Sequence, residues 1–154
     1  MNGEGINVIE VRSEKDFDDF IKLPFSLYSK DPLFAPPLIK DMREKFSIKN
    51  PFFLHAKSEY FLAKKDGKLC GRVVSINNYR HNESHNDRVG FFGFFESAND
   101  YAIAKALLDR VSESLRKEGM NRIRGPMNFS TNEECGFLIE GFKEPPILMT
   151  PYNP

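Results

Sequence analysis

Three side chains that could bind a metal are spaced at alternating positions in segment 81–85, His-Asn-Glu-Ser-His. In an extended segment, His81, Glu83 and His85 would share one face, and zinc is bound by such side chains when three or four are held rigidly. The segment is polar and rich in turn-forming residues. It also does not fit the helical zinc-protease pattern, in which the glutamate directly follows the first histidine. We therefore predict a solvated turn here and no metal site.

Of the two cysteines, Cys70 and Cys135, the candidate nucleophile is Cys135. Ser130 precedes Cys135 and could open a helix, and a helix start lowers the pKa of a nearby thiol. No histidine lies close in sequence to activate it, so a small buried cysteine is the preferred interpretation. Two thiols make no disulfide framework, and segment 1–5 has no secretory signal, so we expect a protein of the reducing cytoplasm.

The aromatic run Gly-Phe-Phe-Gly-Phe-Phe at 90–95 has the composition of an RNA-binding strand, in which exposed rings stack on bases. Alternation instead places Phe91 and Phe95 on one face and Phe92 and Phe94 on the other. Lys plus Arg number 22 and Asp plus Glu number 22, so there is no net positive charge to attract a phosphate backbone. We predict a central strand covered on both faces, and neither a nucleic acid nor a membrane as partner.

A strand that ends at Glu96 and a helix over 100–119 are separated by a short turn. The first amides of a helix have no partners within the helix, so such a turn can bind a phosphate or pyrophosphate. Pro126 follows the next expected strand and has no N–H, which favours two parallel strands that part at this point. The sequence predicts a slot there for an extended ligand.

The elements that must position this slot alternate between strands and helices. The helix over 100–119 has an apolar residue every four positions and Gly119 at its end, and Asp66-Gly67 predicts a tight hairpin. A proline should end or kink the first helix at Pro24. The expected elements are strands 6–11, 60–63, 69–76, 88–96, 122–125 and 147–149, and helices from 13, over 38–48, over 100–119 and from the Ser130-x-x-Glu133 capping pattern.

This order predicts one mixed α/β domain over residues 1–154, in which an antiparallel meander is followed by a crossover helix between neighbouring parallel strands. Flanking helices should cover the sheet. An apolar strand at the end of the chain, with no partner after it, suggests the N-terminal part of a longer protein.

Three segments carry a resemblance to a known family: 90–96, 124–136 and the closing Pro-Tyr-Asn-Pro at 151–154. The chain resembles the GNAT superfamily of acetyl-CoA-dependent N-acetyltransferases, and looks like the front half of longer bacterial GNAT-type proteins. The resemblance covers nearly all 154 residues as an order of elements. It implies a GNAT-like sheet, truncated at its C-terminus, and acetyl-CoA as co-substrate.

The resemblance also implies roles for particular residues. The family's turn into the long helix binds the CoA pyrophosphate with an Arg or Gln and two small residues, and the matching positions are Asn99, Ala102 and Ala104, of which Ala104 fits. Phe94 falls where the strand backbone meets the pantetheine arm. Glu96 falls where a carboxylate acts as general base on the amine; favouring the helix start is its structural alternative.

Two functions are open from the sequence. The first is transfer of an acyl group from CoA to a small amine or a peptide. The alternative is a non-catalytic GNAT-like binding or scaffolding module that has lost its pyrophosphate loop, as Asn99 and Ala102 suggest. In either case a further C-terminal domain or a second copy of the chain is an expected partner.

Overall fold

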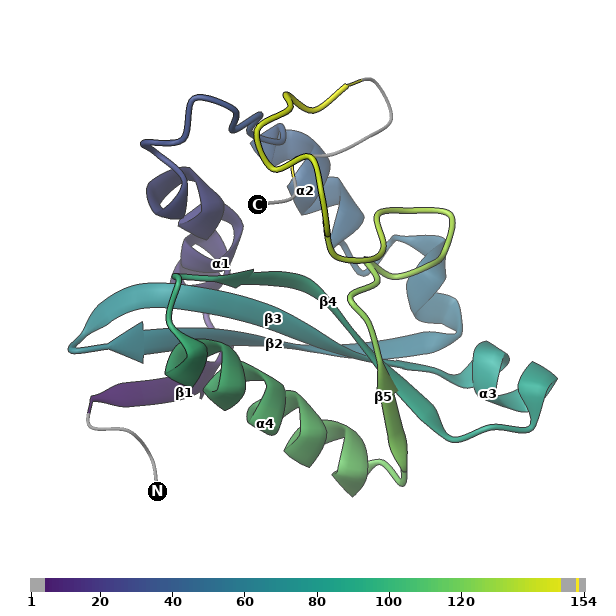
Figure 1. The fold of residues 1–154 in the computed structure, drawn as a ribbon. Coiled ribbons are helices and arrows are strands. Elements are labelled where there is room, and N and C mark those ends of the chain that lie inside the picture. The colour runs from purple at the N-terminus through teal and green to yellow at the C-terminus, as the bar shows by residue number, and fades with distance from the viewer. Residues whose placement is uncertain (1–4, 148–151, 153–154) are drawn as a thin grey trace.

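The computed structural model describes residues 5–147 and 152, and its centre is a five-stranded sheet with helices on both faces (Figure 1). The spatial order of the strands follows their order in the chain. The strands are β1 (Ile6–Glu10), β2 (Ala56–Lys65), β3 (Lys68–Asn78), β4 (Val89–Ser97) and β5 (Arg122–Arg124). The helices are α1 (Glu14–Leu27), α2 (Ile39–Lys45), the 3-10 turn Pro51–Leu54, α3 (Tyr79–His85) and α4 (Tyr101–Lys117).

The sheet is mixed. The first four strands pair antiparallel, whereas β5 pairs parallel to β4. β2 and β3 are joined by Asp66 and Gly67, both with positive φ (51° and 77°), as a tight hairpin requires. The predictions of a meander, of this hairpin and of a parallel pair after the crossover helix are therefore confirmed, as is the α/β class.

Two hydrophobic layers sandwich the sheet. α1 and α2 cover one face, and α4 covers the other (Figure 1). The four-residue spacing in α4 predicts a buried apolar face, and each side chain of that face is at most 2% exposed. The members are Ile103, Leu107, Val111 and Leu115. No helix in the described part of the chain combines the length and the apolar character needed to cross a bilayer.

Pro24 was predicted to end or kink the first helix, and it does not end it, because α1 continues through it to Leu27. Proline lacks the N–H that would bond the carbonyl four residues earlier, so the carbonyl oxygen of Phe20 loses its helical donor. Arg72 supplies a replacement: its Nη1 donates to Phe20 O over 2.7 Å. The helix tolerates the proline because another element satisfies the freed group.

The faces predicted for the phenylalanines of β4 are also wrong. Phe91 and Phe94 lie in the layer beneath α1 and α2, whereas Phe92 and Phe95 pack on the α4 side. The pairing of β4 with β3 shifts between Gly93 and Glu96, and Phe94 has a φ of 49°. This β-bulge inserts one residue into the strand and reverses the alternation beyond it.

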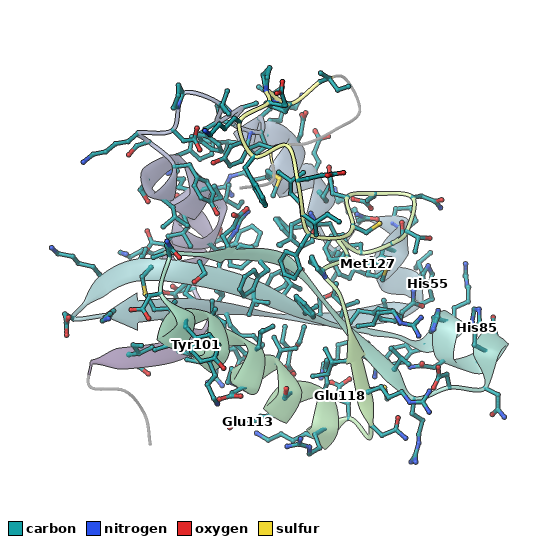
Figure 2. All side chains as sticks on the ribbon, viewed as in Figure 1. His55, His85, Tyr101, Glu113, Glu118 and Met127 are labelled. Atoms are coloured by element: carbon teal, nitrogen blue, oxygen red, sulfur yellow. The ribbon has the colours of Figure 1, made fainter. Side chains whose placement is uncertain are left out.

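Segment 79–85, predicted as a turn, is the helix α3, which Asn78 caps through a bond from His81 N to its side chain. His81 and His85 are therefore one helical turn apart, and their rings stack at 4.3 Å. His85 lies on α3 at the periphery of the molecule (Figure 2). Among the described residues, no three His, Cys, Asp or Glu side chains are grouped as a metal site needs.

The helix predicted from Ser130 does not form. Ser130 and Glu133 close a turn through Glu133 N and Ser130 O (3.1 Å), and the chain then pairs Cys135 with Met127 in an isolated antiparallel bridge. Cys135 is exposed, so the prediction of a small buried cysteine at this position is wrong. The final strand predicted over 147–149 falls mostly outside the described residues.

Candidate functional site at the parting of β4 and β5

The parallel pairing of β4 with β5 stops early. It runs from Val89 and Arg122 to Phe91 and Arg124, and the next peptide of the second strand leads into Pro126. Beyond the proline, Met127 N donates one further bond to Phe92 O (2.8 Å). In Figure 2, Met127 lies where the chain leaves β5 and turns toward the α2 side of the sheet. Ladder pairing therefore ends before Pro126 as expected, but residues 127 and 128 stay in contact with β4, so the protein's own loop fills the predicted slot here.

The β-bulge lies directly beside this parting. Its positive φ at Phe94 points the Phe94 N–H away from the β3 ladder and toward the loop after β5. This N–H donates to the side-chain oxygen Oδ1 of Asn128 over 2.6 Å. The bulge therefore presents a backbone donor to a planar carbonyl oxygen, the kind of acceptor that an acyl group also offers.

Asn128 is held by the loop on which it lies. Its backbone N donates to Glu134 O (2.8 Å), and its Nδ2 donates to the Glu134 carboxylate (3.3 Å). Lys45, at the end of α2, forms ion pairs with Glu133 (2.8 Å) and Glu134 (3.4 Å). Burial alone lowers the pKa of Lys45, but the two carboxylates outweigh it and the pKa is raised. The loop is thus fastened to the α2 side of the sheet.

Glu96 lies two residues after the bulge, near the end of β4, and its side chain is 20% exposed. Each carboxylate oxygen has a donor: the Tyr28 hydroxyl bonds to Oε2, and Arg72 Nη2 lies 3.5 Å from Oε1. Burial and the adjacent carboxylate raise the pKa of Tyr28 above its ordinary value of 10.0, so this hydroxyl stays protonated. Glu96 is therefore fixed in orientation and still reachable from solvent.

An aromatic cluster continues outward from Tyr28. The ring of Tyr152 lies 5.1 Å from Tyr28 and 5.1 Å from Phe34, and Phe34 also contacts Phe25 at 6.0 Å. The Tyr152 hydroxyl donates to Asp31 (2.6 Å) and so lowers the pKa of that carboxyl. These residues come from the end of α1, the following connector and the C-terminal segment, and Tyr28 links the cluster to Glu96 through its hydroxyl.

The other end of the predicted slot is the start of α4, which Figure 2 marks with Tyr101. The helix is capped by Asp100, whose Oδ1 accepts from Ala102 N (2.9 Å) and whose Oδ2 contacts Lys65 Nζ (2.6 Å). The hydrogen bond from Lys65, followed by the Ala102 amide, lowers the pKa of Asp100. An ionised carboxylate therefore occupies the place where a pyrophosphate was predicted.

Comparison with solved structures places this arrangement among known folds. A tandem GNAT protein from the clavulanic acid biosynthesis pathway superposes with a TM-score of 0.57 and 14% identity, over 75% of this chain and 34% of that one. A predicted acetyltransferase with acetyl-CoA from Clostridium acetobutylicum gives 0.53 and 14%, over 77% and 79%. The chain has the GNAT fold.

Two curated proteins are similar to this GNAT-fold chain in sequence. Protein YghO of Escherichia coli is 35% identical over 92% of the chain, and a bacterial ceramide synthase of Caulobacter vibrioides is 33% identical over 97%. The chain spans only 36% and 39% of their lengths, so each relative has a large part with no counterpart here. No model of a protein family matches the sequence.

The GNAT fold brings the predicted site residues to two places. Phe94 and Glu96 lie on β4 at the bulge and just beyond it, whereas Asn99, Ala102 and Ala104 lie around the start of α4. Ala102 and Ala104 do lie in the first turn of α4, but the amide of Ala102 is bonded to Asp100 Oδ1 and that of Ala104 to Asp100 O.

Sequence reasoning missed the two side chains that hold Glu96, namely Tyr28 and Arg72. A signal existed for Arg72, because a lone arginine inside the apolar run 69–76 of a central strand must have a buried partner. For Tyr28, 68 residues from Glu96, no comparable signal exists.

Proposed function

We propose that this GNAT-fold chain belongs to an acyltransferase that moves an acyl group from a CoA thioester to an amine. The observation that supports it is the hydrogen bond from Phe94 N to Asn128 Oδ1 (2.6 Å). The carboxamide of asparagine and the carbonyl of a thioester are both planar acceptors of similar size. Asn128 thus stands where the acyl carbonyl would be held, and Phe94 N–H would stabilise the charge that develops on its oxygen.

Glu96 is proposed as the general base. The amine nitrogen attacks the thioester carbon and loses a proton to Glu96, directly or through one water; the C–N bond forms as the C–S bond breaks. The proton finally resides on the CoA sulfur, which leaves as the thiol, so the net products are an amide and free CoA. Tyr28, on the other side of the carboxylate, keeps Glu96 in a single orientation.

The chemistry of the acceptor is inferred from the aromatic cluster around Tyr28, the residue that bonds Glu96. Phe34 and Tyr152 pack on the Tyr28 ring and are half-buried, so the cluster suits an amine that carries an apolar chain. A relative is named as a ceramide synthase, and a ceramide is an amide of a fatty acyl group with a long-chain amino alcohol. We therefore propose a long-chain amino alcohol as acceptor, and a fatty acyl-CoA or acetyl-CoA as donor.

Replacement of Asn128 by Ala is the direct test of this function. Removing the internal acceptor frees Phe94 N–H for an acyl carbonyl, so binding of palmitoyl-CoA or acetyl-CoA should tighten by about fivefold, the value of one hydrogen bond regained. Binding is measured by calorimetry on the wild-type chain and on the variant. Asn132→Ala, an exposed asparagine on the same loop, is the matched control and should bind like the wild type.

Absence of binding by both the wild-type chain and Asn128→Ala would contradict the proposal that this chain holds the donor. Weaker binding by Asn128→Ala would mean that Asn128 is itself a ligand of CoA and that the carbonyl does not take its place.

Glu96→Gln tests the base. The amide keeps the shape of the side chain but cannot accept the proton, so the rate of CoA release in the presence of the amine should fall by about 100-fold or more. Affinity for the acyl-CoA should stay within about twofold, because Glu96 acts on the acceptor. A full rate in Glu96→Gln, measured with a long-chain amino alcohol, would remove Glu96 from the chemistry.

One observation favours a second function, that of a binding module beside a catalytic part elsewhere in a longer protein. Asp100 places negative charge on the start of α4, which disfavours a pyrophosphate at this point. A module of this kind would not bind CoA by itself. The calorimetry above separates the two functions, since the module predicts no binding by the 154-residue chain under any of the substitutions.

A further inference from the structure

Pro24 creates an acceptor in the middle of the protein that its own helix does not satisfy. In an α-helix the N–H of residue 24 would bond Phe20 O, and proline has no such hydrogen. Phe20 is fully buried, so water does not compensate this oxygen. A buried carbonyl without a donor is costly, and the protein must supply one from another element.

Arg72 supplies it from β3. Its Nη1 donates to Phe20 O over 2.7 Å, and its guanidinium carbon lies 5.0 Å from the centre of the Phe20 ring. The residue is 3% exposed, and desolvation lowers the pKa of its guanidinium from the ordinary value. The guanidinium is planar and has five donors in a fixed fork, so anchoring one edge fixes the direction of the others.

The same guanidinium faces Glu96. Arg72 Nη2 lies 3.5 Å from Glu96 Oε1, while the hydroxyl of Tyr28, at the end of α1, bonds the other oxygen. α1 therefore contacts the Glu96 carboxylate through two side chains. Arg72, which is bonded to the Phe20 carbonyl, faces Oε1, and Tyr28 bonds Oε2. Among the described residues, Nε of Arg72 has no hydrogen-bond partner, so the contacts with Phe20 and Glu96 define how the guanidinium lies.

We propose that Arg72 is a positioning residue, which is anchored on the carbonyl that Pro24 leaves free and which fixes the Glu96 carboxylate against Tyr28. The proposal rests on the proposed function in that Glu96 is the base. A base must lie within hydrogen-bond reach of the proton it removes, and a carboxylate bonded at both oxygens keeps one orientation. In this proposal, Pro24 serves to leave the Phe20 carbonyl free to accept the hydrogen bond from Arg72.

Two substitutions break this connection from opposite ends. Arg72→Met removes the guanidinium and keeps much of the volume of the side chain. Pro24→Ala restores the missing N–H, so Phe20 O regains its helical donor and no longer depends on Arg72. Pro24→Ala should fold at least as stably as the wild type, and so it keeps the test decisive if Arg72→Met does not fold.

Arg110→Met is the matched control. Arg110 also stacks on a buried ring, 4.3 Å from the centre of Phe61, and lies 4.0 Å from the carboxylate of Glu10. It belongs to α4, and the Phe61 ring that it covers lies in the apolar layer on the opposite face of the sheet from Phe20. Its loss should lower stability without any effect on the Glu96 carboxylate.

The first readout is the NMR signal of the Glu96 carboxyl carbon in protein with labelled glutamate, assigned with Glu96→Gln. We expect Arg72→Met and Pro24→Ala to shift this signal, and Arg110→Met to leave it in place. An unmoved signal in Pro24→Ala, together with an unmoved signal or an unfolded protein in Arg72→Met, overturns the proposal. This readout needs no catalytic activity, so it decides on Arg72 even if the proposed function fails.

The second readout is the rate of CoA release from palmitoyl-CoA or acetyl-CoA with a long-chain amino alcohol, expressed per folded molecule. Arg72→Met should lower kcat by about tenfold or more, and Pro24→Ala by a few-fold, while KM for the acyl-CoA stays within about twofold. A purely structural role predicts unchanged kcat in both variants, and that result overturns the proposal. Absence of transfer by the wild-type chain contradicts the proposed function and leaves the NMR result to decide on Arg72.

Discussion

The β-bulge at Phe94 and the start of α4 each have a backbone N–H without a backbone acceptor, and different kinds of side chain accept it. Each presents a backbone N–H that β-pairing or the helix leaves free, and in each a side chain of the protein accepts it: Asn128 for Phe94, and Asp100 for Ala102. The acceptor is a neutral carboxamide at the bulge and an ionised carboxylate at the helix.

This difference predicts different behaviour toward a CoA thioester. A carboxamide oxygen can be exchanged for an acyl carbonyl at little cost, because both are neutral acceptors. A carboxylate opposes a pyrophosphate of the same charge, although Lys65 beside it offsets part of that repulsion. The bulge is therefore compatible with acyl transfer as it stands, and the helix start is the part that argues for a non-catalytic module.

The largest expected effect is a loss of stability at the bulge, because Phe94 is buried and Tyr101 at the start of α4 is exposed. Phe94 is 5% exposed, and its ring lies 4.7 Å from Phe46 and 4.9 Å from Phe129, whereas Tyr101 at the helix start is 82% exposed. Phe94→Ala should lower the free energy of unfolding by about 3–5 kcal/mol because it empties a core site. Tyr101→Ala should change it by less than about 0.5 kcal/mol. Urea denaturation monitored by circular dichroism measures both, and similar losses in the two variants would contradict the assignment of the bulge to the core.

Local sequence signals predicted those parts of the fold that depend on neighbouring residues. The four-residue apolar spacing of α4, the Asp66-Gly67 turn and the lack of an N–H at Pro126 each act within a few positions. They were enough to predict the meander, the crossover helix and the end of the β4–β5 ladder before Pro126.

The features that the sequence did not predict depend on residues far apart in the chain. Pro24 was expected to end or kink its helix. The helix continues past it because an arginine 48 residues later along the chain, Arg72, satisfies the freed carbonyl. The bulge at Phe94 reversed the faces of β4, and its stabilising contact comes from Asn128, 34 residues away. Alternation along a strand holds only without an inserted residue, and nothing in the run 90–95 marks which residue is inserted.

Asp100→Ser tests whether the negative charge of Asp100 is what disfavours a pyrophosphate at the start of α4. Serine is also a good N-cap, so the helix start keeps its geometry, but the negative charge is lost and Lys65 becomes available to a phosphate. If the chain binds the donor, affinity for acetyl-CoA should rise by about fivefold in this variant. Lys65→Met is the complementary change and should weaken binding. Equal affinity of wild type and Asp100→Ser for acetyl-CoA would show that the carboxylate does not oppose the pyrophosphate.

The smallest expected effect is that acid weakens the hydrogen bond from Ala102 N to Asp100 more than the bond from Phe94 N to Asn128. The pKa of Asp100 is lowered from 3.8 in the folded protein by Lys65 and by the Ala102 amide, so the stabilisation from this carboxylate is complete above pH 3.8. As the pH falls below 3.8 and through the lower folded value, Asp100 takes up a proton and this contribution is lost.

Asn128 does not titrate itself, and the Glu134 carboxylate acts on it only through the bond from Nδ2, so the bond from Phe94 N should be affected less than the bond from Ala102 N over the same range. Amide hydrogen exchange followed by NMR should therefore show that, relative to Phe94, Ala102 loses protection as the pH is lowered past 3.8. The Asp100→Ser variant removes the titrating group at Ala102 and should abolish the difference. Loss of protection at both amides in parallel would instead point to global unfolding in acid, and the contrast between a neutral and a charged acceptor would then not govern the stability of the two places.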